Sequence, residues 1–311
     1  MSFINNLLGK TQEQRKKNLV LIIYITTAAV LILTFAIIAT LIADRSDKLP
    51  EGTPDDDLEQ NAVPITKSFE LVDTKKGTLL VVNKTTAKYD FALNPESALK
   101  QMSTNIPKAN GVDAYILRSD RADTFKANAE ALTALNKMAK DFATQNTATD
   151  KKLTVWTAYR SEEAQNALGS SVGGGHSDFH TGMLFELTVN DTANSIASDT
   201  AFDWIYENAH KYGFIERYPE AKSSHTGVSN FDNAFRYVGV AHATYIKTNG
   251  ICLEEYVALL QSSNGTPLTA GEYSITYAKI NTDGKTEVTL PSASATVSGD
   301  NLGGIIITSK K

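Results

Sequence analysis

A run of about 25 uncharged, mainly apolar residues occupies positions 19–43. It is long enough to cross a hydrocarbon core of about 30 Å as a helix, and longer than the roughly 7–15 apolar residues of a cleavable signal peptide. Lys10, Arg15, Lys16 and Lys17 precede the run, and mainly acidic residues follow it. The positive-inside rule therefore predicts a single-pass membrane anchor, with residues 1–18 in the cytoplasm and the remainder outside.

The segment 44–65 shows no apolar period. It is acidic and carries Pro50, Pro54 and Pro64. This composition is typical of a flexible linker.

Helical and strand-like patterns alternate irregularly through residues 66–262. Apolar residues three and four apart predict helices, with Asp123 a candidate N-cap for the first and Gly213 a left-handed cap after the third. The predicted helices are 123–144, 162–168, 201–212, 241–248 and 253–260. The predicted strands are 77–84, 153–158, 183–189 and 235–238. This irregular mixture favours the α+β class.

The pattern changes after residue 264. Residues 265–311 alternate apolar and polar positions between turn signals that include Asp283-Gly284. We expect a small all-β appendage at the C-terminus, either packed against the core as added strands or exposed as a contact for the wall or a partner.

Composition narrows the function classes. The 311 residues suit an anchor, one core domain and an appendage, and the net charge of −5 gives no basic field for nucleic acid. The single cysteine, Cys252, has no partner for an intramolecular disulfide and lies in a predicted amphipathic helix. We expect it to be buried as a small apolar residue.

Three short segments carry a resemblance. Tyr159-Arg160-Ser161 is followed by Gln165, the segment 177–186 reads SDFHTGMLFE, and the segment 235–239 reads FRYVG. Together they resemble the VanY-type D-alanyl-D-alanine carboxypeptidases, zinc enzymes that trim the stem peptide of peptidoglycan. The resemblance covers about residues 66–260, is densest from 153 to 260, and implies a VanY-like fold for that domain.

The resemblance also implies where the reactive residues should stand. The family's zinc ligands fall on Phe179, Glu186 and Ala234, and its general base falls on Phe231. A zinc hydrolase needs three protein ligands and a carboxylate that takes a proton from water. Phenylalanine and alanine have no lone pair to offer, so no catalytic residue and no cofactor is expected, and the chain is interpreted as a pseudoenzyme.

Two alternatives stay open. An active carboxypeptidase could hold zinc through a rearranged site that uses His180, with Asp232 as the base. A one-residue step along an extended chain reverses a side chain, which argues against His180. A structural scaffold of the cell envelope is the other alternative, with Phe179 and Phe231 filling the cleft.

Substrate-binding candidates remain around the expected cleft. Arg160, Gln165, Ser177, Asp178 and His180 are expected to line its rim, and the family's equivalent of Arg160 contacts substrate. A guanidinium pairs well with a carboxylate, and the stem peptide ends in one. Alternatively, Arg160 pairs with Glu186 or Asp178. The expected partners are therefore the membrane and a peptidoglycan stem peptide or an envelope protein.

Overall fold

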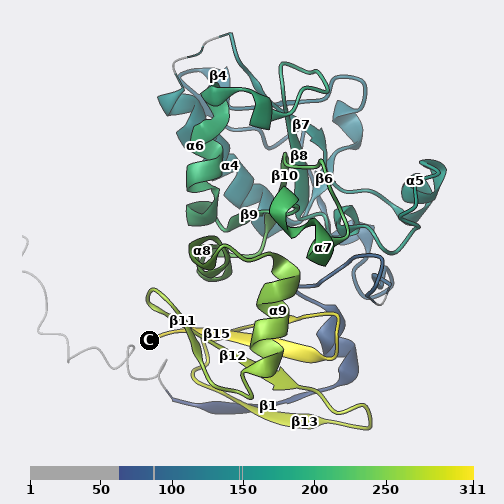
Figure 1. Ribbon diagram of the computed structural model, residues 1–311, viewed down its shortest axis with the longest axis vertical. Helices are drawn as coiled ribbons and strands as arrows, with labels where there is room; N and C mark the ends of the chain where they lie inside the picture. Colours follow the sequence, from purple (N-terminus) through teal and green to yellow (C-terminus); the bar gives the residue numbers. More distant parts are fainter. Residues whose placement is uncertain (1–62, 87, 147, 149) are drawn as a thin grey trace, which may run out of the picture. The chain divides into compact units, whose positions relative to one another are not determined.

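The computed structural model describes residues 63–86, 88–146, 148 and 150–311 (Figure 1). The described residues lie in one compact unit, Asn61–Lys311. The predicted anchor and nearly all of the predicted linker fall outside the described residues. Within the described ranges, no helix is both long and apolar enough to cross a membrane.

A five-stranded sheet forms the centre of the unit, in the order β5-β7-β8-β10-β9. Its strands are β5 (Ile116–Leu117), β7 (Leu153–Thr157), β8 (Leu184–Val189), β10 (Ala234–Tyr237) and β9 (Phe214–Glu216). Only the β5–β7 pair is parallel. The predicted strands at 153–158, 183–189 and 235–238 are confirmed, and so is the α+β class.

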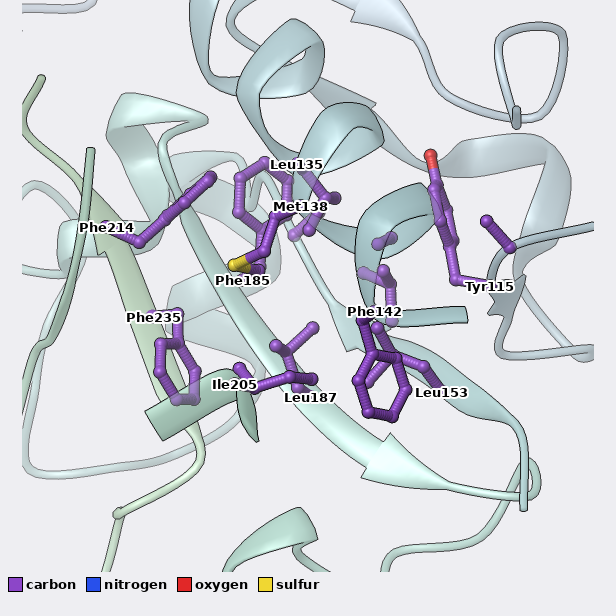
Figure 2. Packing of buried hydrophobic residues seen from close by; sticks show 14 of the residues in the cluster. Tyr115, Leu135, Met138, Phe142, Leu153, Phe185, Leu187, Ile205, Phe214 and Phe235 are labelled. Carbon is purple, nitrogen blue, oxygen red and sulfur yellow. The ribbon is translucent and has the colours of Figure 1, made fainter. Parts of the chain in front are cut away.

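Helix α4 (Ala129–Gln145) packs its apolar stripe against this sheet. Leu135, Met138 and Phe142 lie in one buried cluster with Phe185 and Leu187 (Figure 2). The predicted start at Asp123 is wrong. The Asn128 side chain accepts hydrogen bonds from two backbone N–H groups of the first turn, and the preceding residues are held extended because β6 (Lys126–Ala127) pairs with β2 (Lys100–Gln101).

The other helices of the described residues are short. They are α5 (Glu162–Ala167), α6 (Asp203–Asn208), α7 (Ser223–Thr226), α8 (Val240–Asn249) and α9 (Leu253–Ser262). The 3₁₀ turns are η1 (Leu71–Lys75), η2 (Glu96–Ala98), η3 (Ala122–Thr124), η4 (Asp178–Thr181), η5 (Ile196–Ser198), η6 (Thr200–Phe202), η7 (Ala209–Tyr212) and η8 (Glu220–Lys222). The predicted helix 201–212 is therefore divided into η6, α6 and η7, and it ends at Gly213 with φ of 87°, as expected of a left-handed cap.

The predicted strand 77–84 is wrong. Leu79 to Val82 are buried and lie outside every strand of the described chain. Their backbone groups bond to other partners: Leu79 N–H donates to Ser298 Oγ, and the Leu80 carbonyl accepts from Arg236. An apolar run predicts burial, but a strand also needs a neighbouring ladder, which this segment lacks.

The C-terminal residues form strands, as predicted. They are β11 (Leu268–Ala270), β12 (Tyr273–Lys279), β13 (Thr286–Leu290), β14 (Thr296–Gly299) and β15 (Gly304–Lys310). Four of them make a sheet in the order β11-β12-β15-β14, while β13 pairs with β1 (Ile65–Phe69); a further pair joins β3 (Lys108–Ala109) to β4 (Val112–Asp113).

Helix α9 lies across these C-terminal strands (Figure 1). Ile275 of β12 and Ile306 of β15 share a buried cluster with Val257 and Leu260 of α9 and Ile246 of α8. Cys252, at the start of α9, is 1% exposed, which confirms the expected burial. The strands therefore pack against the core, the first of the two arrangements expected for them.

Candidate functional site

Neighbouring strands bring two positions of the expected site, Glu186 and Ala234, onto one face of the sheet. Ala234 of β10 is the cross-strand partner of Glu186 of β8, and Glu186 is in turn partnered by Thr157 of β7. Directly paired residues project to the same side of a sheet. Phe179 reaches this region from η4, which ends at Gly182 with φ of 65° just before β8 begins.

Aromatic rings occupy the place where these segments meet. Phe179 and Phe231 lie 6.1 Å apart between ring centroids, and Phe231 stacks on Tyr218 at 5.6 Å with an interplanar angle of 13°. We call Phe179, Tyr218 and Phe231 the aromatic floor. Ala234, which is fully buried, and Leu184 complete the same apolar cluster. The four positions that the resemblance assigned to metal chemistry thus converge, and three of them are apolar.

Glu186 is the polar member of the four. Its Oε2 accepts a hydrogen bond from Thr157 Oγ1 at 2.7 Å. Burial raises the pKa of Glu186, against the opposing effects of Thr157 and the Arg160 charge. Across the described residues, no group of three His, Cys, Asp or Glu side chains could hold a metal ion. One carboxylate beside two phenyl rings and a methyl group does not fit zinc, which needs three donors.

His180 does not supply a metal donor in place of Phe179. It is fully buried, its Nε2 accepts from the Gly175 N–H at 3.0 Å, and its Nδ1 lies 2.6 Å from the Arg160 carbonyl oxygen. Because a carbonyl can only accept, Nδ1 carries the proton and the ring is neutral. Burial lowers the pKa of His180, in accord with that state. His180 lies in the 3₁₀ turn η4 rather than in an extended chain, so these contacts, and not the alternation of strand residues, fix the direction of its side chain.

Asp232 does not supply a base to the cleft either. It is exposed, and its Oδ1 accepts a hydrogen bond from Ser195 Oγ at 2.9 Å. Its carbonyl oxygen accepts from the Tyr206 hydroxyl at 3.0 Å. These partners hold Asp232 against the segment that contains η5, outside the cavity beside the aromatic floor.

Asp178 lies in the interior, and its prediction as a rim residue is wrong. It is 1% exposed, and its two carboxylate oxygens accept from Arg217 Nε at 2.6 Å and from Arg236 Nε at 3.0 Å. Glu254 of α9 closes the group with bonds of 2.9 and 2.7 Å to Arg217. We call Asp178, Arg217, Arg236 and Glu254 the buried charge cluster. His180 is likewise absent from the rim, because it is fully buried.

Sequence reasoning missed the two arginines and Glu254. An arginine flanked by apolar residues in a strand, as in FRYV at 235–238, is a usable signal, since a buried guanidinium requires an anionic partner. The partner could not be chosen, because Asp178 and Arg236 are separated by 57 intervening positions with several other carboxylates. The positive charge also acts on Glu254. Burial alone would raise its pKa, but the Arg217 charge and hydrogen bonds, together with the hydrogen bonds from Asn83 and the backbone, outweigh burial and lower the pKa of Glu254.

A cavity of about 220 Å³ opens beside the aromatic floor. Two cationic side chains, Lys84 and Arg160, line it together with His176, and none of the described lining residues is acidic. Ser177 and Gln165 also line it, although both are buried. This lining favours an anionic group next to a small apolar group.

Arg160 lines the cavity beside the aromatic floor. Its Nη1 donates to Gln165 Oε1 at 2.7 Å, and its guanidinium carbon lies 4.5 Å from the Phe179 ring centroid. Gln165 in turn donates to the Val172 carbonyl at 2.8 Å, which ties Arg160 to the loop at the cavity mouth. Within the described part of the chain, Arg160 forms no ion pair, so the alternative of a contact pair with Glu186 or Asp178 is not observed, although the Glu186 charge acts on Arg160 from a distance. Its remaining donors are available to a ligand.

The segment that carries the candidate site is similar to known proteins. A family model described as VanY, D-alanyl-D-alanine carboxypeptidase, matches residues 124–240. A D-alanyl-D-alanine carboxypeptidase of Enterococcus faecium is 30% identical over 161 residues, 49% of this chain and 52% of that protein. One of Enterococcus faecalis is 38% identical over 86 residues, 27% of this chain and 30% of that protein. The match thus spans about half the length, or less, of these two relatives.

Among solved structures, the vancomycin resistance D,D-dipeptidase VanXYg, in complex with a D-Ala-D-Ala phosphinate analog, matches with a TM-score of 0.64. The match covers 80% of this chain and all of that chain at 22% identity, and it shows a shared fold. The matched family segment includes Arg160, the aromatic floor and both strands that carry Glu186 and Ala234. Residues 124–240, which carry the candidate site, are therefore similar to the VanY family of D-alanyl-D-alanine carboxypeptidases.

Proposed function

We propose that this chain is a zinc-free member of the VanY family that binds carboxyl-terminated peptides of the peptidoglycan stem without cleaving them. The aromatic floor carries the proposal. It places Phe179 and Phe231 where the family's resemblance puts a ligand and the general base, and both rings pack against Tyr218 or each other. Rebuilding a metal site there would require displacing packed side chains.

The chemistry of hydrolysis supports a binding role over a catalytic one. Zinc hydrolases need three ligands and an open position for water, and loss of a general base alone costs about 10²–10⁴-fold in rate. His180 and Asp232, the two candidates for a rearranged site, are bonded to backbone and to Ser195 respectively. The active alternative therefore lacks a described set of donors.

The cavity supplies the recognition chemistry. Arg160 presents unused guanidinium donors beside an apolar floor, and Lys84 adds a second cation. A peptide ending in a small residue would place its carboxylate on Arg160 and its methyl group on Phe179 or Phe231. VanXYg, which shares the fold, has been solved with a D-Ala-D-Ala phosphinate analog, and that ligand is of the same chemical class.

Calorimetry of the purified full-length chain with a stem pentapeptide and with its C-terminal amide tests this proposal. We expect the acid to bind more tightly than the amide, and Arg160→Ala to weaken the acid about 10–100-fold while leaving the amide nearly unchanged. Arg160→Lys should recover only part of the loss, because lysine lacks the planar fork. No free D-alanine should appear when zinc is supplied.

The two parts of this proposal, the absence of cleavage and the binding of a carboxylate, can fail separately. Release of D-alanine with zinc present would replace the pseudoenzyme with the active alternative. Equal affinity for acid and amide, or no binding to either, would reject the carboxylate clamp. It would leave the scaffold function, which the packing of Phe179, Tyr218 and Phe231 favours.

We further propose that the domain is held outside the cytoplasmic membrane by residues 19–43, where it would meet the stem peptide or an envelope protein. The charge asymmetry around this run supports that orientation. A protease added to intact protoplasts should digest the chain beyond about residue 50. Full protection of the domain would reverse the orientation.

A further inference from the structure

A second cavity, of about 250 Å³, lies on the opposite face of the sheet from the aromatic floor. Phe235 and Glu216 are cross-strand partners on β10 and β9, and both line this cavity. Ala234, the residue before Phe235, belongs to the cluster of the aromatic floor. Because successive strand residues project to opposite faces, the two cavities are separate sites.

The second cavity combines an apolar wall with two isolated charges. Phe214, Phe235 and Ile246 supply buried apolar surface. Glu216 is half-buried in β9, and Lys247 is exposed on α8. Both line the cavity, and across the described residues neither side chain forms an ion pair or a hydrogen bond.

Glu216 and Lys247 interact electrostatically without forming an ion pair. Burial raises the pKa of Glu216, and the Lys247 charge opposes that rise. Their side chains do not come within the 4.0 Å that defines an ion pair. Lys222 also lines the cavity, but it is already paired with Glu255 at 2.9 Å. A carboxylate and an ammonium therefore face one apolar space, and each lacks a counter-charge in contact.

We propose that this cavity binds a small zwitterion, either a free amino acid or a dipeptide with an apolar side chain. The ligand's ammonium would lie on Glu216, its carboxylate on Lys247, and its side chain against Phe214, Phe235 and Ile246. A purely cationic ligand would leave Lys247 unused, and a purely anionic ligand would meet repulsion from Glu216. The cavity is smaller than the roughly 300–1,000 Å³ of most ligand pockets, which suits one or two residues rather than a longer peptide.

Calorimetry of the full-length chain with leucine and with glycyl-leucine tests the proposal. At least one should bind, and Glu216→Gln or Lys247→Gln should each weaken it by about tenfold or more, since each removes a charge-assisted contact. Glu287→Gln on β13 and Lys140→Gln on α4 are matched controls on exposed sites, and neither should change the affinity. Arg160→Ala should also have no effect, because Arg160 lines the other cavity.

Dipeptides with one blocked terminus test the two charged contacts separately. N-acetyl-glycyl-leucine should bind weakly to the wild type, and Glu216→Gln should not lower its affinity further. Glycyl-leucine amide should behave in the same way with Lys247→Gln. The proposal is overturned if neither leucine nor glycyl-leucine binds, if Glu216→Gln leaves the affinity unchanged, or if Arg160→Ala abolishes binding.

Discussion

Replacing Asp178 by asparagine should destabilise the folded domain severely. The substitution keeps the shape of the side chain but removes the charge that joins two arginines. Asp178 accepts from Arg217 at 2.6 Å and from Arg236 at 3.0 Å, and all three side chains have no exposed surface. An asparagine would turn its NH₂ group toward one guanidinium, so a donor would face a donor.

The size of the destabilisation follows from the burial of these charges. The buried charge cluster holds two arginines against Asp178 and Glu254, and the substitution leaves one positive charge uncompensated in the interior. Removing one partner of a buried ion pair costs about 3–5 kcal/mol. For a unit of this size, 1 kcal/mol shifts the melting temperature by about 2–4 °C, so a fall of roughly 6–20 °C is expected.

Asp120→Asn provides the matched control. Asp120 forms an ion pair with Arg118 at the same distance, 2.6 Å, but its side chain is 55% exposed. Exposed pairs contribute about 0–1 kcal/mol, so its melting temperature should hardly change. The melting temperatures of both variants, measured by calorimetry or circular dichroism, test this prediction. Equal, small shifts for Asp178→Asn and Asp120→Asn would refute the argument that the cluster stabilises the fold through uncompensated charge.

Two further predictions concern titration and metal binding. Burial lowers the pKa of His242 to about 4. Between about pH 6.5 and 4, the unfolded chain therefore binds one more proton than the folded chain. As the pH falls through that window, the free energy of unfolding should fall by about 3 kcal/mol. His242→Gln should flatten this slope in pH-dependent melts; an unchanged slope would contradict it. Substituting Phe179→His, Glu186→Asp, Phe231→Glu and Ala234→His together should create zinc affinity measurable by calorimetry, whereas Ala234→His alone should not. A folded quadruple variant without zinc affinity would show that these positions were wrongly aligned.

Much of the fold followed from local pattern. Strands at 153–158, 183–189 and 235–238 were predictable because each apolar run is bounded by turns and has a neighbour in the sheet. The segment 77–84 has the same kind of run, yet its backbone bonds to Arg236 and Ser298. Which partner satisfies a buried backbone is a tertiary property, and periodicity does not contain it.

The positions of the site residues could be predicted from the sequence, but the solvent exposure of their side chains could not. Phe179, Phe231 and Ala234 converge as expected, because two antiparallel strands and the turn before them fix their register. Asp178 and His180 were expected at the rim and are buried, since η4 turns both side chains inward. The decisive contacts for them come from Arg217 and Arg160, which no local spacing identifies.

The buried charge cluster and the aromatic floor explain how this fold could persist without zinc. A metal ion in the family's position would link η4, β8 and β10. Here Phe179 on η4 contacts Phe231 before β10, and Asp178 on η4 bonds to Arg236 within β10. A buried aromatic ring contributes about 1.5–3 kcal/mol, so these contacts can hold the same segments together. Restoring the ligands would remove that packing, and the zinc-binding variant should therefore be less stable than the present chain until metal is added.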